Sequence, residues 1–378
     1  MRVGIVTLPL HANYGGILQA YALKTVLQSL GYQVTVFDYK NKTWFPQWWK
    51  APYIYTKRGL LRVFKGSAGP EVFKEYRIRR EFPVISSEIA PFIKEKISPR
   101  LLGTFSEIQP DEFDAFVVGS DQVWRPKYFP GKIENAFLAF TQGHDVKRVS
   151  YAASFGTIDM EYDYTVLEQC SKLLSAFNAV SVRENSAVQM CSEWFDREDA
   201  VHVADPVLLL SRDIYSALAN KASRRPCKGK VLSYLLDRSA SKKHITDLVS
   251  RWTTLDVHDA SIAPTDRSVP LSERVLTSIE EWLSCFEDAE FVVTDSFHGC
   301  VLSLIFHKPF LVIGNVTRGL ARFQSLLEIA GLEDRIVQGV DPQDDGTYWL
   351  KPLDWESVDR KLEQFKVKSL EFLNTALQ

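Results

Sequence analysis

The sequence predicts an α/β protein of two doubly wound domains, and three observations support this prediction. Short apolar runs of strand length alternate with helical patterns in both halves of the chain, and this alternation is typical of parallel sheets covered by helices. A length of 378 residues exceeds one compact domain and suits two domains of ordinary size. The composition, with 46% hydrophobic and 24% charged residues, is that of a folded chain rather than a disordered one.

The first half repeats the order strand, loop, helix. Helical spacing predicts helices over residues 17–30 and 164–177, and apolar runs predict strands over 3–8, 33–39, 114–119, 148–153, 179–182 and 201–204. Gly31 follows the first helix as a C-cap glycine does. Residues 41–110 interrupt this rhythm, so we interpret them as an insertion in a first domain that covers residues 1–210.

The second half repeats the pattern over a second domain, residues 211–378, and the polar and basic residues around 210–229 form the crossing between the domains. Strands are predicted over 230–236, 254–257, 290–295 and 309–313. An apolar helix is predicted over 299–306, and a final helix from Trp355 could pack back on the first domain. A long amphipathic helix follows Pro270, with one face formed by Val275, Ile279, Trp282 and Phe286.

Composition and cysteine usage exclude several classes of protein. A net charge of −2 provides no overall positive field, so we expect no nucleic-acid partner. The chain has no signal-peptide pattern and no apolar run of membrane-spanning length. The five cysteines are widely spaced and include no CxxC pair: Cys170, Cys191, Cys227, Cys285 and Cys300. This pattern favours reduced thiols over a zinc site or disulfides, so we expect a cytoplasmic protein that needs no metal.

The segment 294–299 is the leading candidate site, because ligands of open α/β sheets bind beyond the carboxyl ends of the strands. Asp295 or Ser296 can cap the following helix, whose free N–H groups favour an anion. His298 then lies in the first turn, where it can donate to that anion or shuttle a proton. Gly299 permits close approach of a ligand. The alternative is that His298 only caps or packs.

Two further groups follow predicted strands of the first half. In the turn at Asn13, the paired glycines Gly15 and Gly16 allow close approach of a substrate. Their spacing is neither that of a dinucleotide-binding motif nor that of a P-loop. The alternative is that these glycines only form a tight turn. In the second group, Ser120 precedes Asp121, which can hold a sugar hydroxyl or act as a base, and Trp124 can stack on a sugar ring. A capping aspartate and a core tryptophan are the alternatives.

Arg183 ends the predicted strand over 179–182. Its guanidinium fork matches a carboxylate or phosphate, so it is a candidate anion clamp. The alternative is a surface salt bridge with Glu184, which would contribute little to stability.

These groups, in this order, resemble the polysaccharide pyruvyl transferase family. The matching pieces are residues 15–23, 118–124, 150–156, 181–184, 204–206 and 294–299. The resemblance implies two Rossmann-like domains facing a cleft in a GT-B-like arrangement. It also implies transfer of pyruvate from phosphoenolpyruvate, with no other cofactor, to sugar hydroxyls of a surface polysaccharide or its lipid-linked precursor, where a cyclic ketal forms.

The resemblance assigns roles residue by residue. The histidine before glycine falls on His298, as general acid or phosphate clamp, and the arginine of the SxRE pattern falls on Arg183. The family pattern does not assign the base, for which we infer Asp121 or Asp295 as candidates. Several family members have Arg-Leu where this chain has Ser296-Phe297. Either another cation replaces that guanidinium, the candidates being Arg318, Arg322 and Lys308, or the donor differs from phosphoenolpyruvate.

Two other functions stay open. One is a GT-B glycosyltransferase that uses a nucleotide sugar, with Glu273, Glu280 or Glu281 in the nucleotide pocket, and the other is a catalytically inactive glycan-binding relative.

The segment 44–65 combines aromatic residues with cations and has no acid among its charged residues. It could rest at the inner face of a membrane or hold a lipid-linked acceptor, or it could be a folded lid with its aromatic residues in the core. The residues concerned are Trp44, Trp48, Trp49, Tyr53, Tyr55, Lys50, Lys57, Arg58, Arg62 and Lys65.

Overall fold

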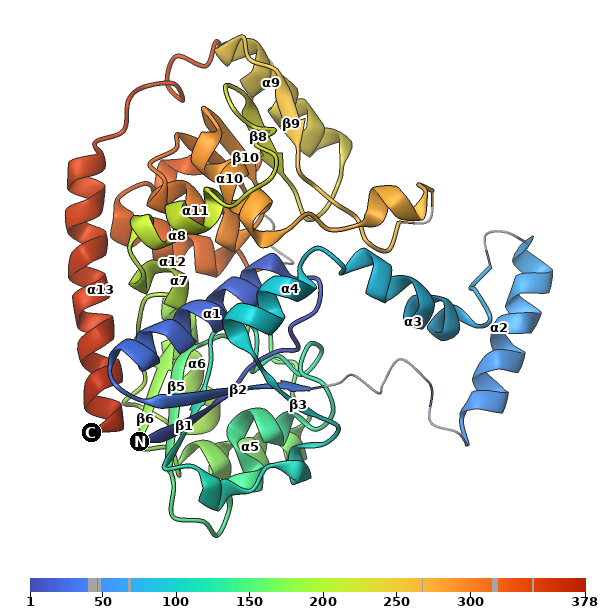
Figure 1. Ribbon diagram of the computed structural model, residues 1–378, viewed down its shortest axis with the longest axis vertical. Helices are drawn as coiled ribbons and strands as arrows, with labels where there is room; N and C mark the ends of the chain where they lie inside the picture. Colours follow the sequence, from blue (N-terminus) through green and yellow to red (C-terminus); the bar gives the residue numbers. More distant parts are fainter. Residues whose placement is uncertain (40–45, 47–48, 67–68, 267, 315–318, 342) are drawn as a thin grey trace.

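A computed structural model of the chain contains two parallel sheets, each lying between helices (Figure 1). It describes all residues except 40–45, 47–48, 67–68, 267, 315–318 and 342. The first sheet has the strand order β3-β2-β1-β4-β5-β6-β7 and the second β12-β11-β10-β8-β9. Successive residues of the central strands enter cores on opposite faces, as Val117 and Val118 do in β4. The predicted fold class is therefore right.

The first sheet includes one strand that the sequence did not predict. β3 lies within the predicted insertion 41–110 and pairs with β2, so this insertion contributes to the sheet edge; three residues without an apolar run give too weak a signal. The strands of this sheet are β1 (Arg2–Val6), β2 (Gln33–Tyr39), β3 (Arg100–Leu102), β4 (Ala115–Val118), β5 (Lys147–Ala153), β6 (Ala179–Val182) and β7 (Val201–His202).

Three helices around the first sheet begin soon after a strand ends, α1 after β1, α6 after β6 and α7 after β7. α1 starts at Tyr14, so Gly15 and Gly16 lie in its first turn and not in a separate turn before it. The helices of this region are α1 (Tyr14–Ser29), α2 (Ala51–Lys65), α3 (Lys74–Ile85), α4 (Ala90–Phe92), α5 (Tyr164–Leu174), α6 (Asn185–Phe195), α7 (Pro206–Leu209) and α8 (Arg212–Ala219).

The second sheet contains the predicted strands and one that the sequence did not predict, β12 (Ile336–Val337), which pairs with β11. The helix α12 (Leu320–Ala330) was also not predicted, and two predicted bounds are corrected. The strand predicted over 254–257 begins only at Val257, and the long helix predicted after Pro270 begins at Ile279, where Ser278 caps it by accepting from the Glu281 N–H. Val275 therefore lies outside that helix. The elements are β8 (Val231–Tyr234), α9 (Ala240–Thr253), β9 (Val257–Asp259), α10 (Ile279–Asp288), β10 (Phe291–Thr294), α11 (Phe297–Ile305), β11 (Phe310–Ile313), α12 (Leu320–Ala330), β12 (Ile336–Val337) and α13 (Trp355–Leu377).

Two elements tie the domains together. α3 reaches the second domain, where Glu81 pairs with Arg274 at 2.9 Å and the Ile85 carbonyl accepts from the Leu276 N–H. α13 runs along both domains (Figure 1), and its Ser369 hydroxyl accepts from the backbone N–H of Ala204 at 2.8 Å. These contacts join residues of the first domain to residues of the second. Within the described part of the chain, no helix combines the length and apolarity needed to cross a bilayer.

Candidate active site

His298 lies in the first turn of α11, where that helix meets the first domain. The hydroxyl of Ser296 caps α11 by accepting from the Gly299 N–H. The imidazole packs directly on α1, because a Cβ added to Gly15 would lie 2.0 Å from its Nδ1. Nε2 lies 3.6 Å from a carboxylate oxygen of Asp205, too far for a hydrogen bond but close enough for an ion-pair contact.

The ring is enclosed between the domains instead of facing an open cleft, which corrects the sequence-based picture. Only 7% of the His298 side chain is exposed, and its Nε2 is buried without a hydrogen-bond partner among the described residues. Gly15 explains this closure, because the missing side chain lets the first turn of α1 cover the imidazole. A buried polar atom without a partner is unfavourable and marks a place where a ligand atom can bind.

Asp205, Arg183 and Asp121 form a buried chain of charges beside this histidine. Nη1 of Arg183 lies 3.0 Å from Asp205, and Nη2 lies 3.4 Å from Asp121. Each of the three side chains is at most 5% exposed. The guanidinium is therefore not part of a surface salt bridge with Glu184.

The sequence assigned no role to Asp205, although the structure places it at the centre of this array. Its carboxylate accepts from the Ser120 hydroxyl at 2.9 Å and from the Val207 N–H at 3.0 Å. Burial alone would raise the pKa of Asp205, but His298, Arg183 and the Val207 N–H together hold it well below its usual range. The available signal was an aspartate before a proline at the end of a strand, which is also what an ordinary helix cap looks like.

Asp121 connects this buried array with the surface. It has φ of +75°, a left-handed conformation that is unfavourable for a residue other than glycine, and its carbonyl is fixed by the N–H of Ser154. Its Oδ2 accepts from the amide of exposed Asn13 at 3.1 Å. A Cβ on Gly16 would approach both of these side chains. Asn13, Gly16 and Asp121 thus form the outer end of the cluster.

Two guanidinium groups flank the ring of Phe297. Arg183 lies 4.7 Å from the ring centroid and Arg322 lies 5.8 Å from it. Burial, followed by repulsion from Arg183, lowers the pKa of Arg322 to about 10. Arg322 is therefore the predicted replacement cation that reaches the site. Arg318 lies outside the described residues, and Lys308 lies beyond the far end of α11, so the prediction for Lys308 is wrong.

Trp124 belongs to the core of the first domain, so the predicted sugar-stacking role is wrong. The indole is 0% exposed, stacks on Phe137 with ring centroids 5.1 Å apart, and donates to the Ala136 carbonyl. The segment after β4 folds over it and leaves no face free for a ligand.

Asp295 and Gly299 have local structural roles. The Asp295 carboxylate is fully buried, pairs with Lys242 at 2.5 Å and accepts from the N–H of Leu236, so it fixes the segment after β8 and is not placed to act as the base. A Cβ on Gly299 would lie 2.4 Å from Oγ1 of Thr294. A glycine is therefore required at this position for the packing of α11 on β10, and not for the predicted contact with a ligand.

The acids considered for a nucleotide pocket lie in the first turn of α10 and in the short turn before it. Glu281 pairs with Arg224 at 3.1 Å, while Glu280 occupies the first turn of α10 and Glu273 is exposed in a short turn before that helix.

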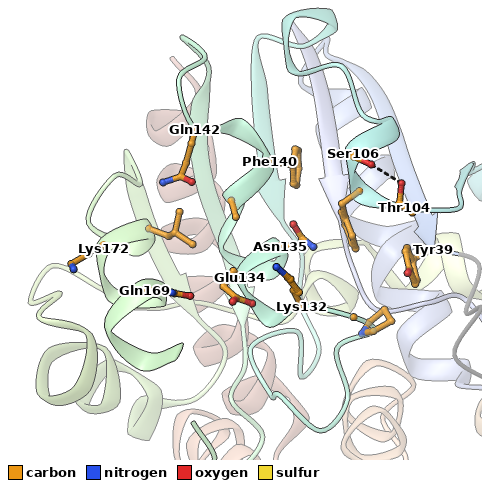
Figure 2. A pocket seen from close by; sticks show the side chains of 15 residues that line it. Tyr39, Thr104, Ser106, Lys132, Glu134, Asn135, Phe140, Gln142, Gln169 and Lys172 are labelled. Carbon is orange, nitrogen blue, oxygen red and sulfur yellow. Dashed lines mark hydrogen bonds between the residues drawn. The ribbon is translucent and has the colours of Figure 1, made fainter. Parts of the chain in front are cut away.

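A cavity of about 920 Å³ lies elsewhere in the first domain. Figure 2 shows it between α5, which contributes Gln169 and Lys172, and the segments that carry Tyr39 and Thr104. None of the residues around His298 lines this cavity. We therefore locate the candidate active site at the domain junction, where charge and unpartnered polar atoms coincide.

Comparisons with known proteins agree with this architecture. The sequence model of a family described as polysaccharide pyruvyl transferase matches residues 13–316, whereas no curated protein matches the chain. UDP-GlcNAc 2-epimerase from Neisseria meningitidis, bound to UDP-GlcNAc, shares 12% identity at a TM-score of 0.50, with 100% of this chain and 99% of that chain covered.

Two further structures have lower scores. The UDP complex of S. aureus MnaA has 14% identity and a TM-score of 0.47 over 96% of this chain and 90% of that chain. The E. coli heptosyltransferase WaaC with ADP has 13% identity and a TM-score of 0.39 over 96% and 99%. Together with the two parallel sheets, the similarity to the epimerase establishes a GT-B-like fold of two Rossmann-like domains.

Proposed function

The chain belongs to the polysaccharide pyruvyl transferase family, and from this premise we propose that it transfers pyruvate from phosphoenolpyruvate to two hydroxyls of a sugar. The acceptor is a surface polysaccharide or its lipid-linked precursor, and the product is a cyclic ketal. The observation that supports this most is the unpartnered Nε2 of His298, buried between the domains beside Asp205 and Arg183.

The donor is an anion with a phosphate and a carboxylate, and the junction offers groups suited to both. Arg183 and Arg322 flank Phe297, and guanidinium groups bind carboxylate and phosphate with two parallel hydrogen bonds. The first turn of α11 adds backbone N–H groups and the positive end of a helix dipole. In this proposal the phosphate binds near α11 and the carboxylate near Arg183.

His298 and Asp121 divide the proton transfers. Protonation of the donor's methylene carbon, with His298 as the acid, makes C2 cation-like, and one sugar hydroxyl attacks C2 while Asp121 takes its proton. The second hydroxyl then bonds to C2 as the C–O bond to phosphate breaks. One hydroxyl proton ends on the new methyl group and the other leaves with phosphate, so the transfer balances without an oxidant or reductant.

Entry of the donor requires the domains to separate, because the imidazole is enclosed. Among the described residues, the polar contacts between the two sides near the site include the His298–Asp205 contact and two hydrogen bonds. The Tyr14 hydroxyl donates to the Thr277 carbonyl at 2.9 Å, and the Asn185 N–H donates to the Ser325 hydroxyl at 3.0 Å. Closure over the bound donor excludes water from the cation-like intermediate and brings the acid and base to it.

Calorimetry tests the choice of donor. We expect the wild-type chain to bind phosphoenolpyruvate and the variant Arg322→Lys to bind it more weakly, because an ammonium group lacks the two-bond geometry. Binding of UDP- or GDP-sugars in place of phosphoenolpyruvate would favour a glycosyltransferase. Mass spectrometry of a panel of acceptors then tests ketal formation, and a sugar that binds without gaining a pyruvyl group would favour an inactive glycan-binding relative.

We also propose that α2 contacts an anionic membrane surface, where a lipid-linked acceptor would be found. α2 has no buried residue and extends away from both sheets (Figure 1). Large apolar side chains on it are 55–83% exposed: Tyr53, Leu60, Val63 and Phe64. Trp49 just before the helix is 58% exposed, whereas Trp44 and Trp48 lie outside the described residues.

The charges of α2 also favour binding to an anionic membrane surface. Lys50, Lys57 and Lys65 lie on or beside the helix, and α2 contains no acidic residue. Arg58 is instead held by Glu75 at 2.7 Å, which ties the helix to the first turn of α3. An amphipathic helix with cations and aromatic residues binds in the plane of the lipid headgroups, and each cation near an anionic surface adds about 1 kcal/mol.

A further inference from the structure

Three metal-binding side chains meet in the second domain. The sulfurs of Cys227 and Cys285 and a ring nitrogen of His258 all lie within 4.8 Å of one another. Cys227 precedes β8 and therefore lies toward the amino ends of the strands, whereas His298 follows the carboxyl end of β10. The cluster is thus separate from the candidate active site.

Each of the three side chains comes from a different and well-fixed element. Cys227 is held in a turn in which its carbonyl accepts from the Lys230 N–H. His258 lies in β9, in register with Leu232 of β8, and Cys285 lies in the middle of α10. Rigid elements that bring ligands together are what a metal site requires.

The arrangement of burial also fits a site for an ion. Cys227 is 0% exposed and Cys285 is 3% exposed, while half-buried His258 provides a path from solvent. All five cysteines are free thiols, but Cys170, Cys191 and Cys300 do not belong to a comparable group among the described residues.

We propose that Cys227, His258 and Cys285 bind a thiolate-preferring divalent metal ion, zinc being the best match. Two thiolates, one imidazole and a water molecule form a common four-coordinate zinc sphere, with Zn–S about 2.3 Å and Zn–N about 2.0 Å. Binding releases one proton from each thiol. The two thiolates and the neutral imidazole then balance the 2+ charge, so the buried site carries no net charge.

The ion would stabilise the surface on which the first domain docks. α10 also carries Trp282, which stacks on Tyr14 of α1 with ring centroids 4.8 Å apart. Tyr14 directly precedes Gly15, which covers His298. A metal ion that joins α10 to β9 and to the segment before β8 therefore holds α10 in position against α1.

The sequence argued against a zinc site because no CxxC pair is present. The absence of a CxxC pair excludes only a site whose ligands are close in sequence. Cys227, His258 and Cys285 are far apart in the chain and meet through the packing of β8, β9 and α10.

Cobalt titration of the full chain tests the proposal. The protein is reduced, stripped of metal with a chelator and titrated with Co²⁺. We expect one equivalent to bind with thiolate-to-cobalt charge-transfer absorption, and Zn²⁺ to displace it. The variants Cys285→Ser and His258→Ala should bind cobalt more than about tenfold more weakly. The matched control Cys170→Ser, a buried thiol of α5 in the first domain, should leave the titration unchanged.

His258→Ala keeps the test decisive if Cys285→Ser fails to fold, because half-buried His258 is the milder change. The proposal is overturned if the reduced wild-type protein gives no thiolate-to-cobalt absorption. It is also overturned if Cys170→Ser removes that absorption, or if Cys227 and Cys285 form a disulfide and bind no cobalt after reduction.

Discussion

The Nε2 of His298 in the second domain lies 3.6 Å from the carboxylate of Asp205 in the first domain. His298 follows a strand of the second sheet, and the contact places it beside the buried charges of the first sheet, those of Asp205, Arg183 and Asp121. The two sheets therefore share one site.

Gly15→Ala should disturb the site without disturbing either sheet. The added methyl would lie 2.0 Å from the His298 imidazole, so the ring or the helix has to move, at a cost of about 1–3 kcal/mol. We expect transfer to fall by more than about tenfold because a misplaced catalytic group loses rate steeply. Gly59→Ala, where an added Cβ meets nothing within 4 Å, is the matched control for activity and for Tm.

Asp121→Asn should lower kcat with little change in KM for the donor. The substitution keeps the shape and the contact with Asn13 but removes the base, and general base catalysis contributes about 10²–10⁴-fold. Steady-state kinetics measure both constants. A kcat close to that of the wild type would show that another group takes the hydroxyl proton.

Membrane binding should depend on the exposed face of α2. Replacing Val63 and Phe64, which are 80% and 83% exposed, by Glu should reduce partitioning onto anionic vesicles by about tenfold or more. Sedimentation with vesicles measures this, and Ile158→Glu, at an exposed apolar residue of the first domain (64%), should bind as the wild type does. Equal partitioning of all three proteins would rule out the proposed contact.

Stability should fall on acidification through His202. Burial lowers the pKa of His202 from 6.5 to about 4, although its hydrogen bond with the Arg183 carbonyl opposes the shift. The unfolded chain therefore binds the proton first, and stability is lost as pH falls from 6.5 towards 4, by an amount of order 3 kcal/mol.

Denaturant titrations at several pH values check this dependence. His202→Gln should flatten it, whereas His144→Gln, at a more exposed histidine, should retain it. An unchanged slope in His202→Gln would assign the acid sensitivity to another group.

Local patterns predicted most of the sheets. The strands at 33–39 and 179–182 have the predicted bounds. The strand at 179–182 is largely buried, as a central parallel strand is expected to be. The strand at 33–39 was recognisable from its β-branched and aromatic residues, although only Val36 and Phe37 of it are buried. β3 and β12 were missed because they are only three and two residues long. The helix after Pro270 begins later than predicted because Ser278 provides the cap and the preceding turn packs against α3.

The site was predictable only in part, since its key contacts join residues far apart in the chain. His298, Arg183 and Asp121 follow strands, which is a local signal, but the pairing of Arg183 with Asp205 depends on how β6 and β7 align. Trp124 also follows a strand, but it is a core residue. The local sequence does not show that the segment after β4 buries the indole.

Replacement of His298 tests the central claim most directly. Release of phosphate from phosphoenolpyruvate and gain of a pyruvyl mass on the acceptor are measured for wild type, His298→Ala and the control His144→Ala. We predict that His298→Ala loses both by about 10²–10⁴-fold with Tm nearly unchanged, while the control is fully active. Wild-type turnover in His298→Ala would contradict the account.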